Sequence, residues 1–288
     1  MYYVFLLPAL AYLAIFCYVP LYGIQIAFKR FTPGLGIFGS PWVGFRNFTA
    51  FFTSYQFFTL LKNTLSLSLF MLLANTPIPV ILALLLHYCK FNKFKKFTQT
   101  ITYAPHFISM VVLVGMVIVL FSMNGPVNQL IMKLGGERIF FMGKPELFRP
   151  IYVWSGVWQQ TGWSSIIFIA TLTSISPELH EAAIVDGTNK LQRIIHIDLP
   201  GLAPTFIILL ILNTGHLMSV GFEKAFLLQN SVNIEVSEII STYTYKVGLG
   251  NAQFSYSTAI GLFNNTINFI LLITVNKISG FFSGTSLW

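Results

Sequence analysis

The residues best suited to specific recognition lie in one segment between two long apolar runs. It begins at Ser176 and reads SPELHEAAIVDGTNKLQRIIHIDLPGLAP. Ser176 and Pro177 predict the start of a short helix, and Gly187 predicts its end, because glycine readily adopts a left-handed backbone. Asn189 and Gln192 have the spacing of a capping box and predict a second helix. Small and apolar side chains exposed on such helices need a partner, so the segment, about 176–200, predicts a docking element.

A second group of polar and aromatic side chains lies within the apolar runs. Aromatic faces combined with amide groups can contact a polar ligand without any charge, so these side chains are candidates for lining a pathway through the membrane. Each candidate also has a structural interpretation, since Trp anchors span ends at the interface and Asn holds membrane helices together. Both interpretations stay open for the candidates, which are Trp154, Trp158, Gln159, Asn213, His216, Asn264 and Asn268.

Motifs for catalysis and metal binding are absent from the sequence. There is no GxxxxGK[ST] phosphate loop, HExxH, GxSxG or Cys/His cluster with metal-ligand spacing. Cys17 and Cys89 are too far apart for a CxxC site, and two cysteines make no disulfide framework. We therefore expect a chain that is not an enzyme and that binds no metal or cofactor of its own.

The composition identifies the environment in which these residues must be held. Of 288 residues, 55% are hydrophobic and only 9% are charged, and the mean hydropathy is +0.72. Soluble domains are about 25% charged, so a water-soluble globule is excluded. The net charge of +8 fits loops beside anionic lipid, and we expect no nucleic-acid partner.

Charge-free runs locate the membrane-spanning segments, since a spanning helix needs roughly 20 apolar residues. The sequence thus predicts an all-α, polytopic, single transmembrane domain over residues 1–288. The first run lacks the features of a signal peptide, and its abrupt apolar start leads us to expect a polar leader before it. Six runs qualify: Met1–Phe28, Asn63–Leu86, Phe97–Phe121, Pro150–Pro177, Leu199–Phe222 and Val247–Asn276.

Basic residues predict the orientation of these runs. The 17 basic residues divide between alternate loops, ten on one side and seven on the other. On the side with seven, however, four lysines crowd one short turn, at positions 90, 93, 95 and 96. Lysine and arginine in short loops favour the cytoplasmic side, so we place this turn, both termini and the docking segment there.

The apolar runs carry no acidic or basic residue near their middles. Proton or sodium coupling normally requires such residues. A stand-alone secondary carrier or facilitator for a small polar solute is therefore disfavoured, although it remains the alternative. For the histidines His106 and His216, hydrogen bonding within the bundle is the competing interpretation to proton relay.

The docking segment matches a specific family pattern. Glu181-Ala182-Ala183, Asp186-Gly187, Ile197 and Leu199-Pro200 resemble the EAA loop of binding-protein-dependent ABC importer permeases. The resemblance extends over the whole chain to the polysaccharide and complex-oligosaccharide subgroup of the maltose-type carbohydrate uptake family. Thr188 departs from the pattern, because many members have Ala there. Further similar segments are 18–23, 40–44, 213–215, 221–223 and 285–288.

The resemblance implies the type I ABC importer permease fold and a location in the bacterial cytoplasmic membrane. The chain would translocate a carbohydrate, most simply an oligosaccharide, using ATP hydrolysed with Mg on a partner subunit. Its implied partners are membrane lipid, a second permease subunit, two ATP-binding subunits and an extracytoplasmic sugar-binding protein. The implied ATPase-docking residues are Glu181, Ala182, Ala183, Asp186, Gly187, Leu199 and Pro200. Alternatively, the two acids only cap and solubilise a surface loop. The sugar and the identity of the second permease stay open.

Overall fold

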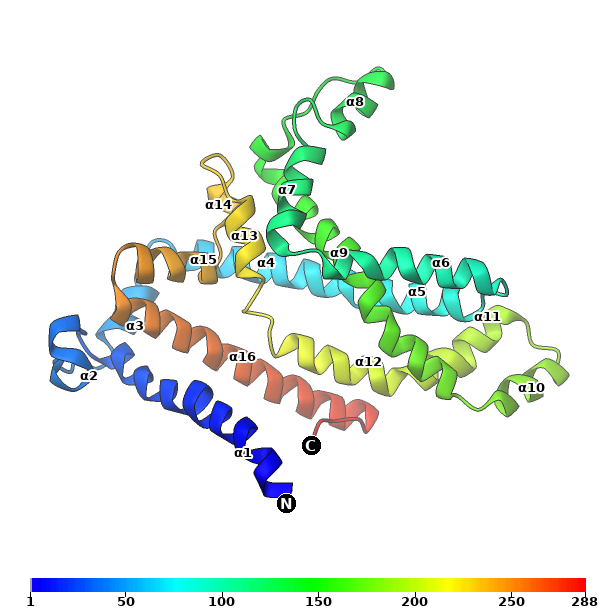
Figure 1. The fold of residues 1–288 in the computed structure, drawn as a ribbon, viewed down its shortest axis with the longest axis horizontal. Helices are drawn as coiled ribbons and strands as arrows, with labels where there is room; N and C mark the ends of the chain where they lie inside the picture. The colour runs from blue at the N-terminus through cyan, green and yellow to red at the C-terminus, as the bar shows by residue number, and fades with distance from the viewer. Residues whose placement is uncertain (1) are drawn as a thin grey trace. The chain divides into compact units, whose positions relative to one another are not determined.

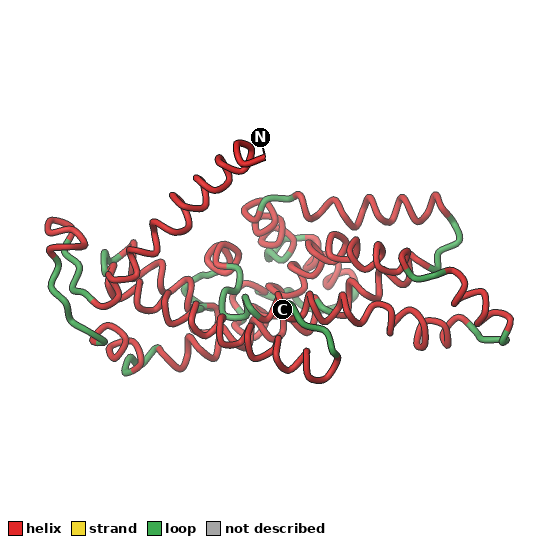
Figure 2. Tube along the Cα trace, turned by 90° about the horizontal axis from the view of Figure 1, so that it is seen from below, coloured by secondary structure: helices red, strands yellow, loops and turns green. Residues whose placement is uncertain are grey.

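A computed structural model describes residues 2–288 as helices joined by loops (Figures 1 and 2). Among these residues there is no strand, and the only bridge of β type pairs Lys29 with Trp42. The chain divides into two compact units. The first comprises Met1–Lys62 and Ile239–Ile267, and the second comprises Asn63–Glu238 and Asn268–Trp288.

The first unit is built around aromatic contacts. The buried Phe51 makes edge-to-face contacts with Phe57 and Phe263, an arrangement that aromatic rings prefer. This unit contains α1 (Tyr2–Tyr12), a π-helical turn (Leu13–Tyr18), a 3-10 helix (Val19–Phe28), α2 (Gly36–Gly39), α3 (Arg46–Phe52), α15 (Ile240–Tyr245), and the first parts of α4 (Phe57–Asn75) and α16 (Phe254–Ser283).

The second unit packs around the long helix α9, Pro145–Ser174, which contacts several other helices. Gly162 lets α9 approach α6 closely, because a Cβ there would lie 2.0 Å from the Thr102 carbonyl oxygen. Buried Val80, Phe168 and Leu202 join α5, α9 and α12 in one apolar cluster. The remaining helices are α5 (Pro77–His87), α6 (Asn92–Tyr103), α7 (Met110–Leu120), α8 (Pro126–Lys133), α10 (Pro177–Val185), α11 (Lys190–Arg193), α12 (Leu199–Thr214), α13 (Phe222–Leu228) and α14 (Ile234–Ser237).

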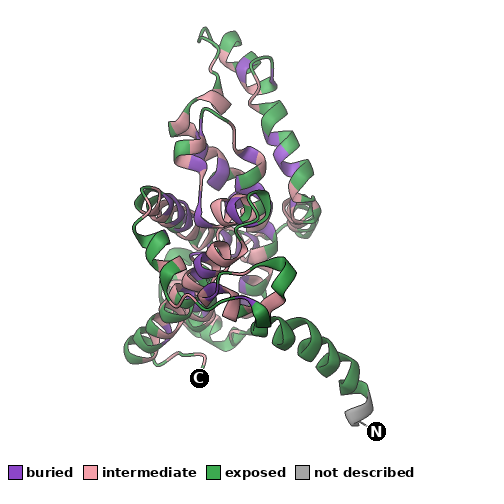
Figure 3. Ribbon diagram, turned by 90° about the vertical axis from the view of Figure 1, so that its left-hand side faces the viewer, coloured by how far each residue is buried: buried purple, intermediate pink, exposed green. Residues whose placement is uncertain are grey.

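Four helical segments are long and apolar enough to cross a membrane: Phe5–Phe28, Phe57–His87, Lys190–Thr214 and Phe254–Ser283. At most 28% of the apolar window in each is buried, and in the first none is, as the exposed N-terminal helix in Figure 3 shows. Such apolar exposure suits contact with lipid. In the predicted run Pro150–Pro177, the structure has α9, whose glutamines, serines and threonines make it more polar than these four.

The predicted run Phe97–Phe121 is not one straight helix. Its two parts, Asn92–Phe107 and Met110–Leu120, meet at an angle of 105°. Ser109 explains the bend in part, because it caps α7 by accepting a hydrogen bond from the Val112 N–H at 3.4 Å. The backbone carbonyl of Ile108, freed by the break, accepts a hydrogen bond from Gln159 Nε2 at 3.0 Å. The prediction of a single span rested on the apolar composition of this run and did not take the cap at Ser109 into account.

Candidate functional site

The second unit contains an open cavity of about 240 Å³. The cavity lies between α4, α9, α13 and the segment that follows α12. Its wall contains the side chain of Asn75, whose Oδ1 is buried without a hydrogen-bond partner in the part of the chain that the structure describes. An unpartnered buried oxygen is costly, and a ligand hydroxyl would satisfy it. The wall also includes Ser68, Met71, Leu72, Thr76, Met110, Tyr152, Gly156, Gln159, Gln160, Asn213, His216, Leu217, Val220, Gly221 and Lys224.

Three predicted pathway residues, Gln159, Asn213 and His216, come together at this cavity. Gln159 and the other two are more than 50 positions apart in sequence, and the packing of α9 beside α12 unites them. Trp154 and Trp158, also predicted, lie on the exposed face of α9 and are 54% and 50% exposed. They are not part of the cavity wall.

The two asparagines of α16 have different surroundings. Asn268 accepts a hydrogen bond from the Met218 N–H and donates one to Ser219 Oγ, both at 2.8 Å. Asn268 thus joins α16 to the segment after α12, which is the helix-joining role considered for it. Asn264 is buried in the first unit, where its Oδ1 has no hydrogen-bond partner among the described residues.

His106 is held by contacts with α9. Its Nδ1 lies 3.0 Å from Gln160 Oε1, and its ring stacks on Trp163 with centroids 4.4 Å apart. The arrangement agrees with a hydrogen-bonded imidazole between helices.

Lys224, at the cavity wall, was not among the predicted site residues. It lies on α13, after the fifth predicted span, and is only 2% exposed. Its Nζ donates a hydrogen bond to the Tyr152 carbonyl at 2.6 Å and lies 4.7 Å from the centroid of the Tyr152 ring. Burial lowers the pKa of Lys224 to about 7. A lysine between Phe222 and Phe226, in a short helix that is apolar apart from Lys224 and Glu223, was the available sequence signal.

The predicted docking segment forms two short helices, as its capping residues indicated. Gly187 ends α10 with a φ of +77°, and Asn189 and Gln192 form the expected capping box. Ser176 stands at the N-cap position, but its side chain makes no capping hydrogen bond. Thr188, which stands where many family members have Ala, stabilises the turn, because its hydroxyl donates a hydrogen bond to the Ala183 carbonyl at 2.6 Å.

The surface of this loop exposes large apolar side chains among polar and charged ones. Glu181, Ala182, Asp186, Gly187, Leu199 and Pro200 are exposed, and Ala183 is half-buried. Around them lie large exposed apolar side chains, of which Val185 is 87% exposed. The others are Leu179, Ile184, Leu191 and Ile195. Several large apolar side chains exposed on one short loop favour contact with a partner.

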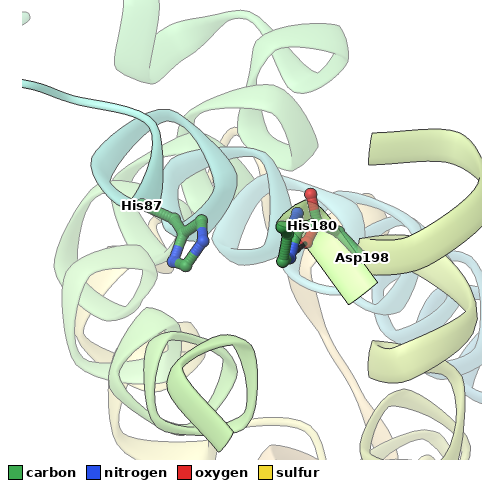
Figure 4. Close-up of side chains that lie close together, drawn as sticks. All are labelled: His87, His180 and Asp198. Carbon is green, nitrogen blue, oxygen red and sulfur yellow. Dashed lines mark ion pairs between the residues drawn. The ribbon is translucent and has the colours of Figure 1, made fainter. Parts of the chain in front are cut away.

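Asp198 connects the loop to α5. Its buried carboxylate accepts a hydrogen bond from the Tyr88 hydroxyl at 2.7 Å, and its Oδ1 lies 3.4 Å from Nε2 of His180 on α10 (Figure 4). Burial and the hydrogen bond to Asp198 raise the pKa of Tyr88 to about 12. His87 offers a third ligand atom within 4.8 Å of the other two, so the cluster has donors suited to a transition metal. This cluster was not apparent from the sequence, because His87 lies more than 90 positions before the segment that holds His180 and Asp198.

Comparisons with known proteins cover nearly the whole chain. Residues 2–279 match the family described as "Binding-protein-dependent transport system inner membrane component". The chain is 45% identical over 278 residues to "Polygalacturonan/rhamnogalacturonan transport system permease protein YteP" of Bacillus subtilis (strain 168), covering 96% of this chain and 87% of YteP. "Protein LplB" of the same organism is 43% identical, with the same coverage.

Solved structures resemble the chain equally closely. A chain of a bacterial ABC transporter involved in the import of the acidic polysaccharide alginate has a TM-score of 0.91 and 39% identity, covering 98% of this chain and 95% of that one. A chain of a bacterial alginate ABC transporter in complex with alginate pentasaccharide-bound periplasmic protein has a TM-score of 0.92 and 38% identity. The match covers 99% of this chain and 96% of that one.

Proposed function

Because the chain belongs to the family of binding-protein-dependent transport system inner membrane components, we propose that its exposed loop docks an ATPase subunit and that its cavity forms part of the sugar pathway. The chain is the inner-membrane permease component of a sugar ABC importer, and it works with a periplasmic binding protein. It is not itself an enzyme, since ATP hydrolysis belongs to separate subunits. Its relatives are permeases of ABC importers, which removes the case for a stand-alone carrier.

The docking role rests on the exposed apolar surface of α10 and α11. Glu181 and Asp186 lie exposed beside Val185 and Ile184, so that a cleft on an ATPase subunit would meet an apolar ridge with two acidic anchors. ATP and Mg would be bound by that subunit. Closure of an ATPase pair would then move two such loops together, and the attached helices would carry the motion outward.

The pathway role rests on the cavity and on its unsatisfied amide, Asn75. Amides from three segments converge there, namely Asn75, Gln159 and Asn213, and amides bind sugar hydroxyls as both donors and acceptors. The names of YteP and of the alginate transporters refer to polysaccharides that carry uronic acids. They support an oligosaccharide containing uronate as the substrate of this chain.

Replacement of Asn213 by leucine tests the pathway. The reconstituted importer, with its second permease, ATPase and binding protein, is assayed for uptake of trigalacturonate per assembled complex. Loss of one hydrogen bond, about 1 kcal/mol, should weaken apparent affinity roughly fivefold while complex assembly stays normal. Trp154→Leu, on the exposed face of the neighbouring helix, is the control and should leave uptake unchanged. Equal effects of both substitutions, or none from Asn213→Leu, would refute the proposed pathway.

A further inference from the structure

Lys224 places a buried positive charge at the wall of a cavity whose other polar groups are uncharged amides, hydroxyls and one imidazole. We propose that the Lys224 ammonium binds a carboxylate of an acidic sugar as it passes through this cavity. The proposal rests on the pathway role of the cavity and adds to it a residue that distinguishes acidic from neutral oligosaccharides.

The first argument is the cost of keeping this lysine buried. An ammonium removed from water loses several kcal/mol of solvation unless a partner compensates it, and buried charges in membrane proteins are therefore retained for function. In the described part of the chain, no carboxylate forms an ion pair with Lys224. The compensation present is one backbone carbonyl and one aromatic ring, both from Tyr152.

The second argument is the donor capacity of the ammonium. A lysine carries three N–H donors, and the structure gives Nζ one hydrogen-bond acceptor, the Tyr152 carbonyl. Two donors remain for a ligand. A carboxylate would supply both the acceptors and the missing negative charge, whereas a sugar hydroxyl would supply only acceptors.

The third argument is the space around Nζ. A Cβ built on Gly156 would lie 3.1 Å from Nζ and 2.4 Å from Met71 Cε. The glycine therefore leaves room for the ammonium where α9 borders the cavity. A larger residue at position 156 would press on the lysine and on Met71.

The fourth argument is the absence of competing anions. None of the residues lining the cavity is acidic. Glu223 is adjacent in sequence, but consecutive residues of a helix face different directions, and Glu223 is not part of the wall. An entering carboxylate thus meets one cation and no fixed negative charge.

The test compares charged and neutral forms of one sugar in the complete reconstituted importer. Trigalacturonate and its methyl ester are each supplied on binding protein whose loading has been measured, and uptake is expressed per loaded binding protein and per assembled complex. Lys224→Gln should lower the apparent affinity for trigalacturonate about tenfold or more, the change expected when a charged hydrogen bond is lost. Uptake of the ester should change by less than twofold.

Three further variants make the result decisive. Lys224→Arg keeps the charge and should preserve the preference for the acid, while Glu223→Gln, on the same helix, should behave as wild type. Lys224→Met removes the charge with similar volume and replaces the glutamine variant if that variant fails to assemble. Equal loss for acid and ester would overturn the carboxylate role. If Asn213→Leu also leaves uptake unchanged, the pathway itself fails; if it lowers uptake, only the role of Lys224 is refuted.

Discussion

The turn at Gly187 provides a test of docking that does not disturb packing. Gly187 has a φ of +77°, and a Cβ there would meet no atom within 4 Å. Substitution at this position therefore changes the backbone preference and introduces no steric clash. Valine is the informative replacement, because a β-branched residue rarely adopts a positive φ.

The expected magnitude follows from this backbone conformation. An ordinary L-residue in the left-handed region costs roughly 1–2 kcal/mol, and valine lies at or above the upper end. At about 2 kcal/mol, the observed turn between α10 and α11 becomes ~30-fold less populated. Asparagine tolerates the left-handed region, so Gly187→Asn should reduce the population of the turn much less than Gly187→Val does.

The assay measures three quantities for each variant: membrane insertion, ATPase subunit retained on purification, and sugar uptake per inserted permease. Gly187→Val should insert normally, retain less ATPase and transport at least tenfold less, with Gly187→Asn close to wild type. Wild-type uptake with ATPase fully bound in the valine variant would show that the loop is not the docking element. Poor insertion of the valine variant alone would show that the turn serves folding of the permease instead.

Three other outcomes are expected. In a background without native cysteines, a cysteine at Asn92 should be shielded from a membrane-impermeant thiol reagent in intact cells, and one at Gly39 should be labelled; the opposite pattern would reverse the orientation. Uptake should persist when the proton gradient is collapsed with ATP maintained, and should stop when the ATPase subunit is inactivated; dependence on the gradient would contradict the ATP-driven cycle. Because burial lowers the pKa of Lys224 to about 7, its charge is present below this pH and lost above it. Affinity for trigalacturonate should therefore fall several-fold from pH 6 to 8.5 in wild type and less in Lys224→Arg, since the sugar carboxylates stay ionised over this range and both proteins keep the other cavity residues, His216 included; identical profiles would contradict this role.

The docking loop was predictable because its structure is local. The capping box joins Asn189 and Gln192, which are three positions apart. The end of α10 depends on the φ angle of one residue, Gly187. Ser176 occupies the predicted N-cap position of α10, although its side chain makes no capping hydrogen bond. Sequence spacing therefore predicted the helix limits better than individual hydrogen bonds.

The cavity was less predictable because it depends on packing between distant segments. Helical spacing correctly places Trp154 and Trp158 on one face of α9, yet it cannot tell which face turns toward the cavity. Gln159 faces inward and the two tryptophans do not. The burial of Lys224 could not be predicted either, because it depends on contact with Tyr152, 72 positions away in the sequence.

The bend between α6 and α7 bears on how the chain is built into the membrane. The carbonyl of Ile108 at this bend is bonded by Gln159, which is synthesised 51 residues later. Until that glutamine emerges, the carbonyl has no such partner, and an unpaired carbonyl in hydrocarbon costs several kcal/mol. We therefore expect the segment around Ile108 to reach its final bent form only after α9 has been synthesised and inserted beside it.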